Sequence, residues 1–126
     1  MADPKRTHRS AIRFALGLPD AYEDHPWGET VAKVGSKVFV FFGSGDASTA
    51  PGMTLKLRES NQAAVGVPGA AAAAYGLGKS GWVTIRLQSE GSPPLPVLQD
   101  WIEESYRLVA PKRSVAALDA RPASRS

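Results

Sequence analysis

The chain has 126 residues and contains no cysteine. Disulfide bonds, thiolate metal ligands and a cysteine nucleophile are therefore excluded. No stretch approaches the roughly 20 apolar residues that a membrane-spanning helix needs. The basic N-terminal residues precede no apolar segment of the kind found in secretory signal peptides, so we expect a cytoplasmic protein.

Histidine is also scarce, with two residues in the chain, His8 and His25. His8 lies in a basic segment without an evident partner. His25 follows Glu23 and Asp24, but in an extended strand only Glu23 shares its face, whereas a metal site needs three or four converging ligands. A catalytic triad lacks candidates, because His25 is the one histidine in the expected folded body. We therefore expect no metal, no cofactor and no enzymatic activity; an enzyme would require His25 to face a cleft beside Glu23 or Glu29.

Acidic residues are few at the two ends of the chain. Residues 1–13 carry four basic residues and one acidic residue, and residues 107–126 carry five and one. Residues 14–106 carry six basic and ten acidic residues, so this central part has a net charge of −4 although the whole chain has +3. The net positive charge alone is therefore weak evidence for a nucleic-acid partner, because phosphate binding needs clustered positive charge.

The segment from Pro26 to Gly43 gives the clearest structural signal. Residues 31–34 alternate in character and are followed by Gly35-Ser36 and then by an apolar run that ends at Phe42. A glycine-containing pair between two β-prone runs predicts a hairpin, since glycine accepts the positive φ of a tight turn. The second strand is apolar on both faces, so we expect it at the centre of a sheet.

Further elements are predicted on both sides of this hairpin. Apolar residues at helical spacing predict helices over 5–17, 58–65 and 95–109. The last helix has an apolar face of Leu98, Trp101, Ile102, Ser105, Leu108 and Val109 and a polar face of Asp100, Glu103, Glu104 and Arg107. Strands are predicted over 21–25, 53–57 and 82–87, loops or turns over 43–52 and 76–81, and a loop or edge segment from Ala70 to Tyr75. In the strand over 82–87, Trp82, Thr84 and Arg86 take one face and Val83, Ile85 and Leu87 the other.

These elements predict one domain over residues 1–118, followed by a disordered basic tail over residues 119–126. The expected fold class is α+β, a two-layer sandwich in which an antiparallel meander sheet carries the helices on one face.

Gly78-Lys79-Ser80 is similar to the end of a phosphate-binding loop. That motif requires glycine at position 73, where this chain has alanine. A strand rather than a helix follows, so helix amides would not point at a phosphate. We predict a β-turn with a solvated Lys79.

Basic and aromatic residues recur in the predicted strands and turns. On one sheet face they would form a surface that binds the nucleic-acid backbone. The set consists of Lys33, Lys37, Lys56, Lys79, Arg86, Trp27 and Trp82. The alternatives are that the cations are solvated strand positions that protect an edge, and that the two tryptophans pack in the core. Lys33 and Lys37 flank the hairpin turn and are candidates for cross-strand neighbours.

Several motifs, in this order along the chain, resemble those of the MmcQ/YjbR family. They are Leu-Pro-Asp-Ala-Tyr-Glu-Asp-His-Pro-Trp-Gly-Glu at 18–29, Lys-Val-Gly-Ser-Lys-Val-Phe at 33–39, Met-Thr-Leu-Lys-Leu at 53–57, Gly-Trp-Val at 81–83 and Glu-Ser-Tyr-Arg-Leu-Val at 104–109. The resemblance spans residues 14–118 and implies a CyaY-like or secretion-chaperone-like fold, DNA binding of the "double wing" type and no enzymatic activity. The positions that match the family pattern are Trp27, Lys37, Phe39, Lys56, Trp82, Ser105 and Tyr106. Of these, we expect Phe39 and Tyr106 in the core.

The residues and the resemblance together predict a small cytoplasmic DNA-binding protein. It would contact phosphates through the basic residues of the sheet and of the termini, with Trp27 or Trp82 stacking or packing nearby. The alternative is a non-enzymatic adaptor that binds a protein or a small ligand on the sheet face, as a homodimer.

Overall fold

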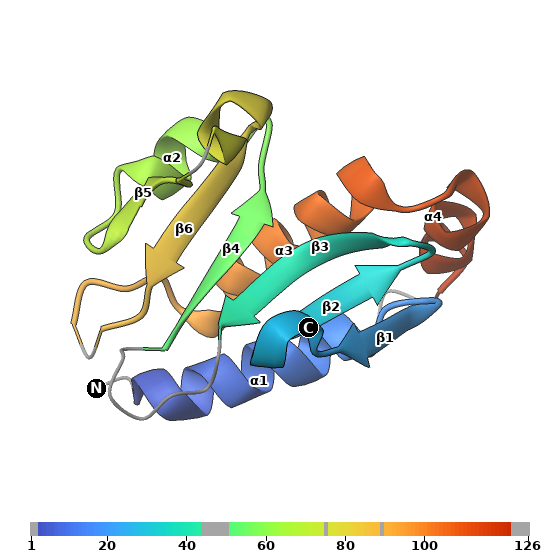
Figure 1. The fold of residues 1–126 in the computed structure, drawn as a ribbon, viewed down its shortest axis with the longest axis horizontal. Helices are drawn as coiled ribbons and strands as arrows, with labels where there is room; N and C mark the ends of the chain where they lie inside the picture. The colour runs from blue at the N-terminus through green and yellow to red at the C-terminus, as the bar shows by residue number, and fades with distance from the viewer. Residues whose placement is uncertain (1–2, 44–50, 75, 89, 122–126) are drawn as a thin grey trace.

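The computed structural model describes residues 3–43, 51–74, 76–88 and 90–121 (Figure 1). Within them, the helices are α1 (Pro4–Leu16), α2 (Asn61–Val65), α3 (Leu95–Val109) and α4 (Lys112–Asp119), with short 3-10 helices η1 (Pro26–Gly28) and η2 (Leu77–Ser80). The strands are β1 (Ala21–Asp24), β2 (Thr30–Val34), β3 (Lys37–Gly43), β4 (Gly52–Lys56), β5 (Ala70–Ala72) and β6 (Trp82–Arg86). In these residues, no helix is long and apolar enough to cross a membrane.

The predicted hairpin is confirmed as strands β2 and β3. Gly35 in the turn has a φ of 62°, which favours glycine, and the Tyr22 hydroxyl donates a hydrogen bond to its carbonyl oxygen over 2.7 Å. Strand β3 lies between β2 and β4, inside the sheet, as its apolar sequence predicts. Of the loop predicted over 43–52, residues 44–50 lie outside the described residues.

The six strands form one antiparallel sheet in the order β1-β2-β3-β4-β6-β5. The five predicted strands β1, β2, β3, β4 and β6 lie side by side in chain order, as a meander requires, and β5 adds an outer edge beside β6. Burial explains this order: Val83 and Ile85 of β6 are fully buried, whereas Ala71 and Ala72 of β5 are exposed. Part of the segment over 70–75 is thus an edge strand.

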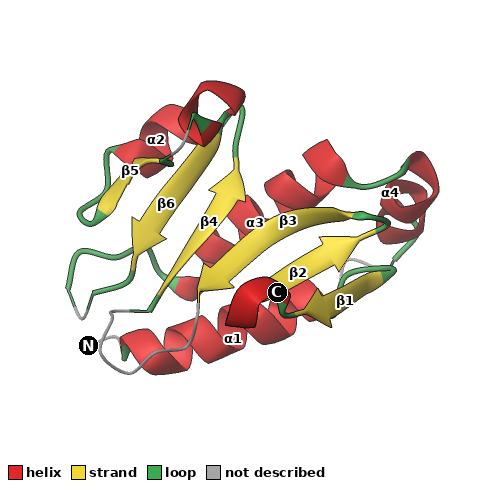
Figure 2. Ribbon diagram, viewed as in Figure 1, coloured by secondary structure: helices red, strands yellow, loops and turns green. Residues whose placement is uncertain are grey.

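The helices pack on one face of the sheet, which confirms the two-layer α+β sandwich. Ala11 and Ala15 of α1 and Leu98 and Ile102 of α3 are fully buried in the core between the two layers. Helix α2 adds the buried Ala64, and α4 adds partly buried apolar side chains. Figure 2 shows the sheet from its other face, with α1 and α3 behind it. We call this other side the open face.

Bulges in β3 decide which of its aromatic side chains reach the open face. The register between β2 and β3 shifts twice, which leaves Phe39 and Phe42 without partners in β2. Such bulges let two residues oppose one on the neighbouring strand. Phe39, Val40 and Phe42 are all buried in the core, and Phe41, whose register partner is Val31, is left partly exposed.

Side chains from two helices complete the ladder between β3 and β4, which has two residue pairs in register. The strands diverge beyond these pairs (Figure 1), and there the Ser105 hydroxyl of α3 donates to the Phe39 carbonyl (2.6 Å) and accepts from the Lys56 amide (2.9 Å). At the other end of the ladder, Nε2 of His8 in α1 lies 2.9 Å from both the Phe42 and the Gly52 carbonyl oxygens. His8 therefore has partners that the sequence did not reveal.

The sequence analysis did not predict helix α4. The Tyr106 hydroxyl lies 2.7 Å from the Pro19 carbonyl oxygen and 3.2 Å from that of Ser114, and the Ser114 hydroxyl donates to the Asp20 carboxylate over 2.8 Å. Burial raises the pKa of Tyr106, so its hydroxyl stays a donor at neutral pH. Helix α4 ends at Asp119, the first residue of the predicted tail, and residues 122–126 of that tail lie outside the described residues.

Replacing Ser105 by alanine should destabilise the fold. The change leaves the Phe39 carbonyl and the Lys56 amide without their partner, and each unsatisfied buried group costs about 1–3 kcal/mol. We expect urea unfolding to show a loss of about 2–4 kcal/mol in the free energy of unfolding. Ser80→Ala, at an exposed position of η2, is the control and should change stability by less than about 0.5 kcal/mol. Equal effects of the two substitutions would contradict the bridging role.

Candidate binding surface on the open face of the sheet

The open face of β4 and β6 carries three adjacent cross-strand pairs. They are Lys56 with Trp82, Thr54 with Thr84, and Gly52 with Arg86. The Thr54 and Thr84 hydroxyls lie 2.9 Å apart and form a hydrogen bond. The alternation predicted for β6 is confirmed, because its remaining side chains are buried on the helix side. Lysine, arginine and two hydroxyls thus share one strip of this face.

Trp82 packs against Phe41 of β3 across strand β4. The two ring centroids are 5.5 Å apart and the ring planes meet at 63°. Both side chains are partly exposed, and neither belongs to the core between sheet and helices. Of the two alternatives for Trp82, the structure therefore supports the open face. Trp27 lies in η1, and its side chain is outside what the structure describes.

The structure separates the five predicted cations. Lys56 and Arg86 lie on the open face, and neither forms an ion pair with another described residue. Lys37 and Lys79 are exposed beside turns, at the start of β3 and in η2. Lys33 is engaged elsewhere. The sequence-predicted patch therefore reduces to Lys56 and Arg86 as unpaired cations beside the aromatic pair.

Lys33 is held at the edge of the sheet by an ion pair with Asp24 of β1, over 3.3 Å. The Asp24 carboxylate accepts hydrogen bonds from the His25 amide and from the Lys33 ammonium. Both lower the pKa of Asp24, and the bond from the His25 amide has the larger effect. In the register, Lys33 pairs with Val38, so its expected cross-strand pairing with Lys37 is wrong. The bulge at Phe39 does not alter this pairing, because it lies further along β3.

His25 and Glu23 form an exposed pair beside the edge strand β1. Nε2 of His25 lies 2.6 Å from Oε2 of Glu23, and the side chains are 56% and 42% exposed. The His25 and Glu23 side chains lie on one side of the strand, and the Asp24 side chain lies on the other, where it contacts Lys33. The alternation of side chains along a strand predicts this arrangement. Among the described residues, no three histidine, aspartate or glutamate side chains are grouped as a metal ion requires.

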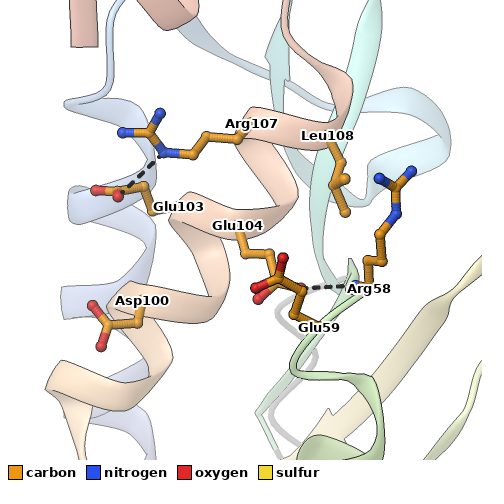
Figure 3. A pocket seen from close by; sticks show the side chains of 7 residues that line it. All are labelled: Arg58, Glu59, Asp100, Glu103, Glu104, Arg107 and Leu108. Atoms are coloured by element: carbon orange, nitrogen blue, oxygen red, sulfur yellow. Dashed lines mark hydrogen bonds and ion pairs between the residues drawn. The ribbon is translucent and has the colours of Figure 1, made fainter. Parts of the chain in front are cut away.

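A cleft of about 390 Å³ lies between α3 and the chain that follows β4 (Figure 3). Its lining residues are Arg58, Glu59, Asp100, Glu103, Glu104, Arg107 and Leu108. His25 and Glu23 are not among them. The sequence places Asp100, Glu103, Glu104 and Arg107 on one polar face of this helix, but it does not reveal the cleft, because Arg58 and Glu59 come from a distant segment of the chain.

Two carboxylates of the cleft, those of Glu103 and Glu104, have partners close by. Glu104 accepts hydrogen bonds from the Arg58 amide (2.7 Å), the Ser60 hydroxyl (2.7 Å) and the Ser60 amide (3.3 Å). Burial of Glu104 opposes its ionisation, but these hydrogen bonds outweigh burial and lower its pKa. Glu103 lies 3.5 Å from Arg107 in an ion pair. Glu104 thereby holds the segment before α2, which explains why this helix begins at 61 rather than 58.

The positions that match the family pattern divide between core and surface. Phe39 and Tyr106 are fully buried with ring centroids 5.3 Å apart, so their expected core role is confirmed. Ser105 joins two strands, as described above. Lys56 and Trp82 share the open face.

The described residues thus form an α+β sandwich in which the α-helices pack on one face of the sheet. A family model described as YjbR matches residues 16–108, and the chain belongs to this family, as its motifs predict. No curated protein matches the chain. The matched span starts at the last residue of α1 and ends before α4, so most of α1 and all of α4 lie outside it.

Glu104→Gln should lower stability at neutral pH and less so in acid. The lowered pKa means that ionised Glu104 stabilises the fold fully above its ordinary value of 4.5, and that this contribution is lost as the pH falls below it. The urea midpoints of wild type and variant should therefore differ between pH 7 and 4.5 and converge as the pH falls below 4.5. Glu90→Gln, at an exposed position without a recorded partner, is the control. A difference between wild type and E104Q that is independent of pH would contradict this assignment.

Proposed function

We propose that this protein binds DNA on the open face of its sheet. The observation that carries the proposal is the Phe41–Trp82 pair, a partly exposed aromatic platform whose register neighbour, Lys56, has no ion-pair partner among the described residues. Aromatic side chains on an exposed sheet stack on bases, and cations beside them contact phosphates. The hydroxyls of Thr54 and Thr84 add hydrogen-bonding groups between Lys56 and Arg86.

The acidic central part of the chain is compatible with this proposal because its charges are segregated. Strands β3, β4 and β6 contain lysine and arginine but no aspartate or glutamate. Four of the acidic residues line the cleft at α3, and two lie in the edge strand β1. A phosphate bound on the central strands would therefore lie nearer to positive side chains than to negative ones. The proposal includes a cytoplasmic location, where the ligand is found, and no catalytic activity.

The variant Lys56→Gln/Arg86→Gln should bind DNA more weakly and with less salt dependence. Each phosphate contact contributes about 0.7 to the slope of log affinity against log salt for single strands, so the slope should flatten by about 1.4. Fluorescence anisotropy with labelled single- and double-stranded DNA across a salt series measures this. The control is Lys112→Gln/Arg113→Gln, which removes two exposed cations from α4. An unchanged slope, or an equal change in the control, would argue against the open face.

Trp82→Leu should weaken single-strand binding by about 1–3 kcal/mol, the contribution of one stacked base. The salt slope should stay the same, because no charge is removed. Leu77→Ala, at an exposed apolar position in η2, is the control and should bind like the wild type. Thermal unfolding of each variant checks that the fold is retained. A fall in the salt slope with Trp82→Leu would show that the substitution acts through the cations rather than through stacking.

A second candidate function is a dimeric protein-binding adaptor. The edge strand β5 favours it, because this strand is alanine throughout, is exposed, and carries none of the charges that usually protect a sheet edge. Val65 and Leu77, which are 36% and 39% exposed, lie in α2 and η2, both of which contact β5. Two copies can pair such edges without charge repulsion. Absence of DNA binding together with a concentration-dependent dimer in sedimentation experiments would replace the first proposal by this one.

A further inference from the structure

Helix α1 presents a row of cations on its outer side. The four residues are Lys5, Arg6, Arg9 and Arg13, and all are exposed. At 3.6 residues per turn they fall within about 100° of arc. The opposite side of the helix carries Ala11 and Ala15, which are fully buried in the core. We call this row the α1 ridge.

None of the four cations of the α1 ridge forms an ion pair with another described residue. The nearest acid in sequence, Asp3, is the N-cap, and its carboxylate accepts hydrogen bonds from the Lys5 and Arg6 amides over 3.1 and 3.4 Å. The ridge therefore presents four positive charges to solvent.

Helix stability favours Arg13, which lies in the last turn, but it does not explain the other three cations. Lys5 and Arg6 lie in the first turn, where the helix dipole favours negative charge, and that turn contains no acidic residue. Lys5, Arg9 and Arg13 follow one another at intervals of four residues, a spacing at which like charges repel. A bound polyanion would reduce both the repulsion between these cations and their unfavourable interaction with the helix dipole.

Two kinds of polyanionic partner differ in what they need from a helix. A helix that binds a membrane surface buries an apolar face among the lipids. In α1 that face is already used, because Ala11 and Ala15 are buried and Ile12, Phe14 and Leu16 pack against the same core. The ridge has positive charge but no free apolar face. Positive charge alone is sufficient to bind the phosphate backbone of a nucleic acid.

We propose that the α1 ridge is a second DNA-binding surface, separate from the open face of the sheet. Helix α1 packs against the core on the helix side and runs along the lower border of the sheet in Figure 1, so its outer side is a different surface from the open face. The sequence assigned phosphate contacts to both basic termini without distinguishing them. The ridge lies on a helix of the folded domain, as the helix predicted over 5–17 implies, and it shares no residue with the sheet site.

Matched pairs of substitutions test the proposal. Arg9→Gln/Arg13→Gln removes two cations from the ridge, and Lys112→Gln/Arg113→Gln removes two exposed cations from α4 with the same change in net charge. Glutamine keeps the helix propensity of both sites. With a labelled DNA duplex, the ridge variant should flatten the slope of log affinity against log salt by about 1.8, and the α4 variant should leave it unchanged. Equal effects of the two variants, or no effect of the ridge variant, would overturn the proposal.

Two further measurements separate the possible outcomes. Sedimentation with phosphatidylglycerol vesicles tests the lipid alternative: ridge-dependent vesicle binding without ridge-dependent DNA binding would overturn the assignment to DNA. Combining the ridge variant with Lys56→Gln/Arg86→Gln should weaken DNA binding more than either variant alone, because each variant leaves the other surface intact. If only the sheet variant changes binding, the ridge proposal fails and the sheet proposal stands; if only the ridge variant does, the reverse holds.

Discussion

The hydroxyl of Ser105 is the contact on which the geometry of the sheet depends. It links the Phe39 carbonyl to the Lys56 amide at the point where β3 and β4 diverge. His8 acts at the opposite end of the same ladder, where its Nε2 lies between two carbonyl oxygens. Strands β3 and β4 have only two residue pairs in register, which would leave neighbouring backbone groups unsatisfied in the middle of the sheet. Side chains of helices α1 and α3 supply the polar partners of these groups. The helix layer thereby joins the two halves of the sheet into one surface.

This junction is what places a candidate site on the open face. Phe41 comes from one half of the sheet and Trp82 from the other, and they meet because β4 is held beside β3. Acidic and basic side chains are also separated between different parts of the molecule. Acidic side chains gather at the cleft by α3, where Glu104 anchors the start of α2, while the central strands carry only basic charges. A net charge for the central residues conceals this separation, since it sums over surfaces that face in different directions.

Local patterns in the sequence identified most of the elements. The hairpin at Gly35, the two faces of β6 and helix α3 from Leu95 to Val109 were all predicted correctly. Each depends on side chains a few residues apart, and such spacing is visible in the chain itself. Helix α4 was not predicted, because the Ser114 hydroxyl binds the carboxylate of Asp20, which is 94 residues away in the chain. The spacing of apolar residues does not reveal such a distant contact. The sequence left the segment over 70–75 open as a loop or an edge segment, because only its pairing with β6 makes part of it an edge strand.

The candidate sites show the same division between local and distant information. By itself, the sequence determined the fold class, the family and the list of basic and aromatic residues in the strands, because residue type and local spacing suffice for these. Only the tertiary structure decided that Lys33 is bound to Asp24, that Trp82 rests on Phe41, and that the N-terminal cations form a ridge on a packed helix. The physical reason is that a side chain's partner and exposure depend on strand pairing and on helix packing. Both are set by contacts between residues far apart in the chain.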